Sequence, residues 1–383
     1  MRTPPFGVER WFVRYEFAVE LNIAESCIQP FSVDELCRLC AVEPSHLLRQ
    51  PVGYADGRGS ADLREAIAAL YPDTSSDEVL VTTGAIEANF LVAQALLEPS
   101  SRAIVEFPAY QQLYAVPRSI GARVDLWELH PEQAYRPDLA ALERLAPAGE
   151  PLSMLTINHP HNPSGVRIDQ ETMAQIALLA ASRGGVLHSD EVYRGLTLGD
   201  EVSPSPSARE ITRDAVVVGS MSKAYGLSGA RIGWIAGPRA LIRRCSEIRD
   251  YISICPAFLS ERLALLVLQH RDAVMARNKG IARRNAVLLR EFLERNSDVL
   301  TCPLPDEGVI AFVRYHRPQG DGRAVPSSRE FCARLAEERG VLLIPGDCFE
   351  RDFFFRIGFG YESAVLKRGL EVFEQYCDEV LRA

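Results

Sequence analysis

Between residues 78 and 236 the chain alternates short β-rich segments with longer segments of helical hydrophobic period. Several β-rich segments are nearly continuous apolar runs, such as residues 215–218, and such runs are typical of strands buried on both faces. Strands are predicted at residues 78–82, 102–106, 123–128, 153–157, 186–189, 215–220 and 231–236. Helices are predicted between them, including residues 85–97 and 170–182. This alternation predicts an α/β fold with a mainly parallel seven-stranded sheet flanked by helices.

After about residue 240 the pattern changes. Residues 262–296 predict one long helix in which Gly280 is the only strong breaker. The last hundred residues predict a smaller α+β domain, with strands at 309–315, 341–344 and 353–357 and helices at 328–339 and 362–381. We therefore expect an N-terminal arm that joins the small domain (1–48), a large domain (49–285) and a C-terminal small domain (286–383). A glycine-rich loop at 53–59 precedes a helix at 60–71 that Ser60 is placed to cap.

Composition narrows the function classes. A net charge of -9 without a basic patch argues against nucleic-acid binding. No apolar stretch is long enough to span a bilayer, and the N-terminus lacks the apolar core of a signal peptide. The nine cysteines are scattered and are expected to be free thiols of a cytoplasmic protein. Cys37 and Cys40 form a CxxC in a helical run, but no second pair accompanies them, so no metal site is predicted.

Ligands in such sheets bind at the carboxyl ends of the strands, so the residues that follow each predicted strand are the candidates for chemistry. Lys223 follows the sixth strand in an apolar, glycine-punctuated segment. A desolvated lysine is expected to have a depressed pKa and can form a Schiff base. Ser220, Ser222 and Arg231 are placed to hold a phosphate beside it, because a guanidinium grips phosphate with two parallel hydrogen bonds.

Three other strand ends carry suitable groups. Asp190 follows the fifth strand, where a carboxylate can pair with a protonated pyridine nitrogen and keep the ring an electron sink. Tyr193 and the turn at Asn162 are placed to donate to the phenolic oxygen of such a ring. The first strand is followed by a helix that opens at residues 84–86, whose backbone N–H groups suit a phosphate. On its own this last turn is better explained as an ordinary glycine turn, because many strand–helix turns contain glycine.

Together these segments resemble the class I/II aminotransferases, which are pyridoxal-phosphate (PLP) enzymes of fold type I. The segments are HPHNPSG (159–165), SDEVY (189–193), SMSK (220–223) and GLSGARIG (226–233). The resemblance implies PLP bound as a Schiff base to Lys223, which then shuttles the proton, with Asp190 as the pyridinium partner. It implies further cofactor contacts by Gly84, Ala85, Ile86, Asn162, Tyr193, Ser220, Ser222 and Arg231.

The same resemblance assigns three more side chains. Tyr110 in FPAY is expected to stack on the ring, and Arg356 in FFFRIGFG to clamp the substrate α-carboxylate. Tyr54 is expected to reach the phosphate of a neighbouring subunit, which implies a homodimer with shared active sites. The alternatives are packing at the dimer seam for Tyr54, a core position for Tyr110 and a surface ion pair for Arg356.

Two histidines precede the predicted ring-oxygen donor Asn162. His159 stands where many relatives have asparagine, and His161 lies next to Asn162. Either histidine can titrate near neutral pH, but a loop role without chemistry is the favoured interpretation of both.

The N-terminal segments ERWFVRYEF and NIAESCIQPFSVDEL are similar to those of the capreomycidine synthases. The similarity implies dehydration and cyclisation of a hydroxyarginine in specialised metabolite biosynthesis. Glu25 departs from that pattern, and we expect it to pair with the substrate guanidinium, with Asn162 also near the amino acid. Alternatives are an aminotransferase that uses a 2-oxo acid and an arginine oxidase or hydroxylase. A PLP-sensing regulator is disfavoured because no DNA-binding segment is recognisable.

Overall fold

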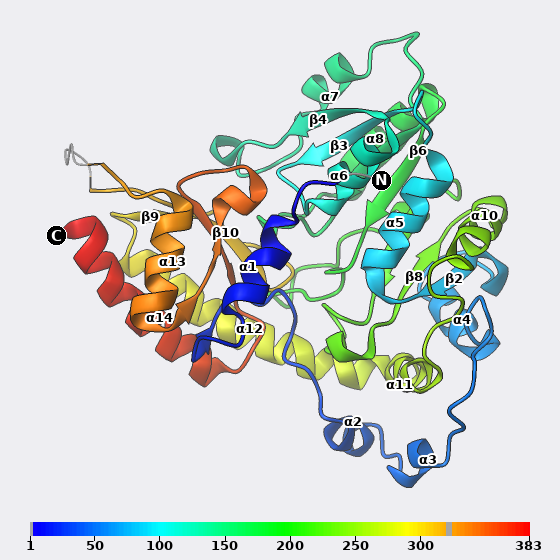
Figure 1. The fold of residues 1–383 in the computed structure, drawn as a ribbon, viewed down its shortest axis with the longest axis horizontal. Helices are drawn as coiled ribbons and strands as arrows, with labels where there is room; N and C mark the ends of the chain where they lie inside the picture. The colour runs from blue at the N-terminus through cyan, green and yellow to red at the C-terminus, as the bar shows by residue number, and fades with distance from the viewer. Residues whose placement is uncertain (1–2, 319–323) are drawn as a thin grey trace.

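A computed structural model describes residues 3–318 and 324–383. Its central sheet has seven strands in the order β2-β8-β7-β6-β5-β3-β4 (Figure 1). Only β8 runs antiparallel to its neighbours; the other pairs are parallel. The strands are β2 (Val79–Thr82), β3 (Arg102–Phe107), β4 (Arg123–Glu128), β5 (Met154–Asn158), β6 (Val186–Asp190), β7 (Val216–Ser220) and β8 (Gly233–Ala236). The predicted α/β fold with a mainly parallel seven-stranded sheet is confirmed.

Alternate residues of the central strands enter two different cores. In β7, Val217 packs into one hydrophobic cluster, whereas Val216 and Val218 pack into another. Since successive side chains of a strand point to opposite faces, both faces of the sheet are covered. The helices of this part of the chain are α4 (Ala61–Ala68), α5 (Gly84–Leu96), α6 (Gln112–Ile120), α7 (Leu139–Leu145), α8 (Gln170–Ser182), α9 (Ala208–Ile211) and α10 (Arg239–Arg249).

A second sheet lies in the C-terminal part of the chain, in the antiparallel order β12-β13-β10-β9. Its strands are β9 (Leu300–Thr301), β10 (Ile310–Tyr315), β12 (Ile344–Pro345) and β13 (Phe354–Gly358). The helices α13 (Ser328–Arg339) and α14 (Ser363–Cys377) pack beside it. The boundaries proposed for the three parts of the chain stay a prediction.

Three local expectations are wrong. The long helix is two helices, α11 (Phe258–Gln269) and α12 (Arg271–Arg295), because His270 leaves the helical conformation at φ -115° and ψ 30°. Gly280 lies inside α12 without breaking it, since a single glycine costs a helix only about 1 kcal/mol. Residues 341–344 form two short strands, β11 (Val341–Leu342) and β12. Ser60 precedes α4 as expected, but its side chain makes no capping hydrogen bond.

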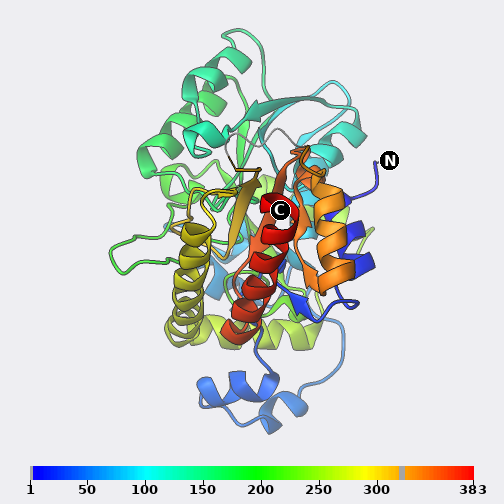
Figure 2. The same ribbon diagram turned by 90° about the vertical axis from the view of Figure 1, so that its left-hand side faces the viewer.

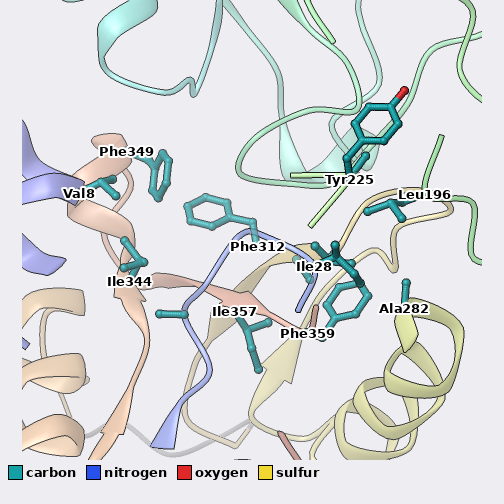
Figure 3. Close-up of a cluster of buried hydrophobic side chains, with 14 of the residues drawn as sticks. Val8, Ile28, Leu196, Tyr225, Ala282, Phe312, Ile344, Phe349, Ile357 and Phe359 are labelled. Carbon is teal, nitrogen blue, oxygen red and sulfur yellow. The ribbon is translucent and has the colours of Figure 1, made fainter. Parts of the chain in front are cut away.

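The N-terminal arm packs against the C-terminal part. Its first helix, α1 (Gly7–Tyr15), lies between the orange α13 region and the central sheet (Figure 1), and Trp11 Nε1 donates to the Leu343 carbonyl at 2.8 Å. The strand β1 (Leu21–Asn22) pairs in parallel with β11. Val8 and Ile28 join Ile344, Phe349 and Ile357 in one buried cluster (Figure 3).

Two short helices of the arm, α2 (Val33–Leu39) and α3 (Ser45–Leu48), lie beyond the main body, at the bottom of Figure 2. Cys37 and Cys40 are buried there as free thiols. Across residues 3–318 and 324–383, no group of three or more His, Cys, Asp or Glu side chains is arranged to hold a metal ion. None of the described helices has the length and apolar character to cross a membrane.

Candidate active site

A cavity of about 570 Å³ lies where β5, β6 and β7 end. Asn158, Asp190 and Ser220, the last residues of these strands, all line it. Asn158 was not predicted from the sequence, whereas Asp190 and Ser220 were. The further predicted residues that line the cavity are Glu25, Ala85, Ile86, Tyr110, Asn162, Tyr193, Ser222, Lys223, Arg231 and Arg356. Side chains that were predicted from separate motifs therefore meet in one cavity.

Asp190 is a buried carboxylate held by neutral groups. Asn89 Nδ2 donates to its Oδ2 at 2.8 Å, and the Val192 backbone N–H donates to its Oδ1 at 3.3 Å. Burial raises the pKa of Asp190 to about 6, although Asn89, the Val192 amide and Lys223 favour the ionised form. Asp190 makes no ion pair with any described residue. A buried carboxyl group of this kind is stabilised by a cation, so it fits the protonated nitrogen of a pyridine ring.

His188 fixes the orientation of the side-chain amide of Asn89. Burial lowers the pKa of His188 to about 4, so the ring is neutral. His188 Nε2 lies 3.1 Å from Asn89 Oδ1, and the assignment that satisfies both residues makes His188 the donor and leaves the Asn89 amide to donate to Asp190. Asn89 was not among the residues predicted from the sequence. Its signal is its position, three residues after Ile86 on a helix that opens at a strand end.

Lys223 points into the cavity, where its amine contacts the N-terminal arm. Nζ donates to Ser26 Oγ at 2.8 Å and lies 3.5 Å from Cys27 Sγ. Burial lowers the pKa of Lys223, but the Cys27 thiol and the Tyr193 phenol raise it, and the net pKa lies above the ordinary lysine value. The expected depression of this pKa is therefore wrong, because the partners outweigh desolvation.

The start of α5 forms a cradle with Arg231. Gly84 has φ +76°, and a Cβ there would lie 2.5 Å from Arg231 Nη2. A Cβ on Gly233 would lie 2.5 Å from the Ala85 backbone nitrogen, so this glycine lets β8 approach the helix start. Arg231 Nη1 donates to Ser222 Oγ at 3.3 Å. A helix N-terminus beside a guanidinium and a serine hydroxyl fits a phosphate group.

Arg356 is almost wholly buried and has no carboxylate partner among the described residues. Nη1 donates to Asn162 Oδ1 at 3.1 Å, and Nη2 donates to the Ala24 carbonyl at 3.2 Å. Its Nε has no hydrogen-bond partner. A buried guanidinium that is held only by neutral acceptors is suited to receive a carboxylate from a ligand.

The first helix supplies a wall of the cavity that the sequence analysis missed. Trp11 and Tyr15 lie on its buried face and away from the cavity, whereas Glu9, Phe12 and Glu16 line the cavity. The buried Val8 and the preceding Phe6 line it as well. The positions 9, 12 and 16 follow helical spacing, and this periodicity is the signal that could have found them.

Glu16 and Glu25 are close enough to share a hydrogen bond. Burial raises the pKa of Glu16, and the charge of Glu25, this hydrogen bond and the charge of Glu9 raise it further. Three carboxyl groups from the N-terminal arm therefore line the cavity, and Glu9 and Glu25 both disfavour the ionisation of Glu16. A bound cation would remove that repulsion.

Tyr110 lines the cavity and connects it to α1. Its hydroxyl donates to Glu9 Oε1 at 2.7 Å, and its ring lies 4.8 Å from that of Phe6. Tyr54 lies outside the cavity and is 89% exposed. Gly84 does not line the cavity itself, but it begins α5 beside it. The contact of Tyr54 with a neighbouring subunit stays a prediction.

Both histidines of the HPHNPSG segment hold loops together. His159 Nε2 lies 2.8 Å from the buried Glu106 Oε1. His161 Nε2 donates to the Pro108 carbonyl at 2.7 Å, so its Nδ1 accepts from the Ser164 hydroxyl. Burial lowers the pKa of His161, which keeps it neutral. These contacts support the interpretation of both residues as loop residues.

The fold and the cavity define a PLP-dependent enzyme of fold type I. The family model described as "Aminotransferase class I and II" matches residues 44–373. The chain belongs to this family, and its cofactor is pyridoxal 5'-phosphate.

Individual relatives add detail. The chain is 30% identical to the capreomycidine synthase of Streptomyces vinaceus over 372 residues, which cover 96% of this chain and 92% of that protein. A PLP-dependent aminotransferase from Streptococcus suis superposes with a TM-score of 0.92 at 32% identity and 99% coverage of both chains. The PLP-dependent cyclase OrfR superposes with a TM-score of 0.89 at 28% identity, covering 100% of this chain and 99% of that one.

Proposed function

We propose that this enzyme dehydrates a hydroxyarginine and closes it to a cyclic guanidino amino acid. The observation that carries the proposal is the group of Glu9, Glu16 and Glu25 on the cavity wall that the N-terminal arm provides. A guanidinium forms two-point hydrogen bonds with carboxylates, so an arginine-type side chain fits this group. The likeness to a capreomycidine synthase and to a PLP-dependent cyclase supports the same reaction.

The two charged ends of such a substrate have separate partners. Arg356 is proposed to bind the α-carboxylate, because it is buried and without a carboxylate partner among the described residues. Glu25 follows Ala24, whose carbonyl accepts a hydrogen bond from Arg356. One short segment therefore connects Arg356 with the group of Glu9, Glu16 and Glu25. The amino acid would thus lie extended across the cavity with its α-carbon near Lys223.

PLP, when bound, supplies an electron sink for the α-carbon of the amino acid. Asp190 is proposed to pair with its ring nitrogen, and Ser222, Arg231 and the start of α5 to hold its phosphate. Lys223 is proposed to carry the cofactor and to remove the α-proton. The acidic group would then hold the guanidinium in a fixed orientation while the hydroxyl leaves. Closing the ring requires that orientation, since an unheld side chain reaches the electrophilic carbon rarely.

A second candidate is an aminotransferase that uses an amino acid donor and a 2-oxo acid acceptor. The superposition on the aminotransferase of Streptococcus suis favours it. The two reactions differ in their requirements. Cyclisation needs no acceptor and keeps every nitrogen, whereas transamination needs a 2-oxo acid and transfers the α-nitrogen.

Product mass separates the two candidates. The PLP-loaded enzyme is incubated with 3- or 4-hydroxyarginine, once without a 2-oxo acid and once with pyruvate. We expect a product that is one water lighter and retains all nitrogens, without any acceptor. Conversion only in the presence of pyruvate, with alanine formed, would establish the aminotransferase instead.

Two further expectations belong to this proposal. A homodimer with shared active sites is supported by Tyr54, which is 89% exposed although it belongs to a segment expected to contact a cofactor phosphate. A cytoplasmic location is supported by the nine free cysteines.

A further inference from the structure

Three polar side chains lead from Asp190 into the buried part of the large sheet, and they are named here the buried network (Thr156, His188 and Asn89). Thr156 on β5 and His188 on β6 are register partners, so their side chains lie beside each other on one face. Asp190 follows His188 by two positions and shares that face. Asn89 of α5 contacts both His188 and Asp190, and all four residues are buried.

The hydrogen bonds of the buried network depend on one another. Thr156 Oγ1 lies 3.3 Å from His188 Nδ1, and His188 Nε2 lies 3.1 Å from Asn89 Oδ1. Asn89 Nδ2 lies 2.8 Å from Asp190 Oδ2. A neutral imidazole has one N–H to donate, and an amide presents its oxygen to one neighbour and its nitrogen to the other. The direction of one hydrogen bond therefore sets the direction of the next.

The two directions suit opposite charge states of Asp190. With its proton on Nε2, His188 donates to Asn89 Oδ1, and the Asn89 amide donates to Asp190. His188 Nδ1 then accepts from the Thr156 hydroxyl. With the proton on Nδ1, the Asn89 amide would turn and bring its oxygen to Asp190, which would have to supply a proton itself. A carboxylate can only accept, so ionised Asp190 needs the first direction.

Few charges compete with the buried network. Burial lowers the pKa of His188 to about 4, so the ring is neutral where Asp190 titrates. Burial raises the pKa of Asp190, whereas Asn89, the Val192 amide and the charge of Lys223 lower it. His188 and Thr156 do not line the cavity, so their influence on a bound group passes through Asn89 and Asp190.

We propose that His188 and Asn89 are positioning residues that hold Asp190 in its ionised form for the cofactor, and that the Thr156 hydroxyl favours the required tautomer of His188. The imidazole proton stays on Nε2, and Asn89 presents its N–H to the carboxylate. The inference rests on the proposed pairing of Asp190 with the ring nitrogen of PLP and not on cyclisation.

The first test determines the tautomer of His188 in the PLP-loaded wild-type enzyme. The chain is labelled with ¹⁵N-histidine and examined by NMR at pH 7, and a spectrum of His188→Gln identifies the His188 signals by their absence. The proton is expected on Nε2. A proton on Nδ1 would overturn the proposal, because the Asn89 oxygen would then face Asp190.

The second test measures the PLP affinity of the apoenzyme between pH 5 and pH 8. His188→Leu removes the donor to Asn89, so Asp190 is less well held as an anion. The decline of affinity at low pH is therefore expected to begin about 0.5–1 pH unit higher. His188→Gln is the matched control, because its amide N–H replaces that of Nε2 and should keep the wild-type midpoint. An unmoved midpoint in His188→Leu, or an equal shift in both variants, would contradict the proposal.

Asp190→Asn distinguishes failure of this inference from failure of the proposed role of Asp190. A decline that persists in Asp190→Asn would remove both. A decline that requires Asp190 but is unchanged in His188→Leu would remove the role of the buried network alone. Thermal melting followed by circular dichroism checks that each variant is folded, and the tautomer of the wild-type enzyme decides the question if His188→Leu is not.

Discussion

The cofactor side and the substrate side of the cavity are built in different ways. On the cofactor side, Asp190 and Ser220 end neighbouring strands, and Lys223 follows three residues after Ser220. On the substrate side, Arg356 contacts Ala24 across 332 positions of sequence. The chemistry of the cofactor is thus set by short local segments on a rigid sheet. In the proposed function, recognition of the substrate depends on how the N-terminal arm packs against the end of β13.

The largest expected effect is on the cofactor side. Lys223→Ala should reduce kcat by about 10³-fold or more, because it removes the amine that is proposed to take the α-proton. Turnover of the hydroxyarginine is the measurement, and the exposed Lys367 provides the control Lys367→Ala. A variant that retained a tenth of the wild-type rate would refute the role of Lys223.

The next effect concerns Asp190 and PLP affinity. Asp190→Asn should weaken PLP binding by about 100-fold, because it leaves the ring nitrogen cation without its partner, a loss of about 3 kcal/mol. The raised pKa of about 6 also predicts a pH dependence of binding. Above pH 6 the carboxylate is ionised and available to the cation, and as pH falls through 6 it becomes protonated and affinity declines.

The Asp190 prediction is checked by titrating the apoenzyme with PLP between pH 5 and pH 8. The decline at low pH should be present in the wild type and absent in Asp190→Asn. An identical pH profile in both proteins would exclude Asp190 as the group responsible.

On the substrate side, Glu25→Gln and Glu16→Gln should each raise KM for a guanidino substrate by about 10- to 100-fold. Each change removes a charged hydrogen-bond partner worth about 1.5–3 kcal/mol. PLP affinity should stay as in the wild type. Glu20→Gln is the control, since Glu20 is exposed and does not line the cavity. An unchanged KM in Glu25→Gln would rule out its contact with the guanidinium.

The smallest expected effect is on stability. Gly358→Ala should lower the free energy of unfolding by about 1–3 kcal/mol, because a Cβ there collides with the Glu25 carbonyl. Gly280→Ala lies inside α12, meets only the flexible Arg284 side chain, and should be neutral or stabilising. Chemical denaturation measures both variants. If Gly358→Ala also raises KM without altering PLP affinity, the segment 23–29 that packs on Gly358 serves the substrate side alone.

The difference between the two sides also explains what the sequence could predict. The bounds of β4 and α8 match the predicted residues, because their hydrophobic period and flanking residues are local. Asp190 and Lys223 were found because each lies at or just past a strand end. Asn89 was missed because a single polar residue on an apolar helix reveals no partner before the sheet places Asp190 beside it.

The misjudged features depend on contacts between distant segments. The pKa of Lys223 was expected to fall, but the N-terminal arm brings Ser26 and Cys27 to its amine. Glu9 and Glu16 face the cavity only because Trp11 packs the opposite side of α1 against Leu343. The break at His270 follows no residue-type rule, since histidine is compatible with a helix interior.

Ring closure is the central claim, and a nitrogen label tests it directly. Hydroxyarginine that carries ¹⁵N in its guanidine group is incubated with the PLP-loaded enzyme in the absence of a 2-oxo acid, and the product is examined by NMR. We expect a new bond between a labelled guanidine nitrogen and a side-chain carbon, in a product that keeps its α-nitrogen. A product in which no guanidine nitrogen has formed a new bond to a side-chain carbon would contradict ring closure. A product that has lost its α-nitrogen would contradict it as well.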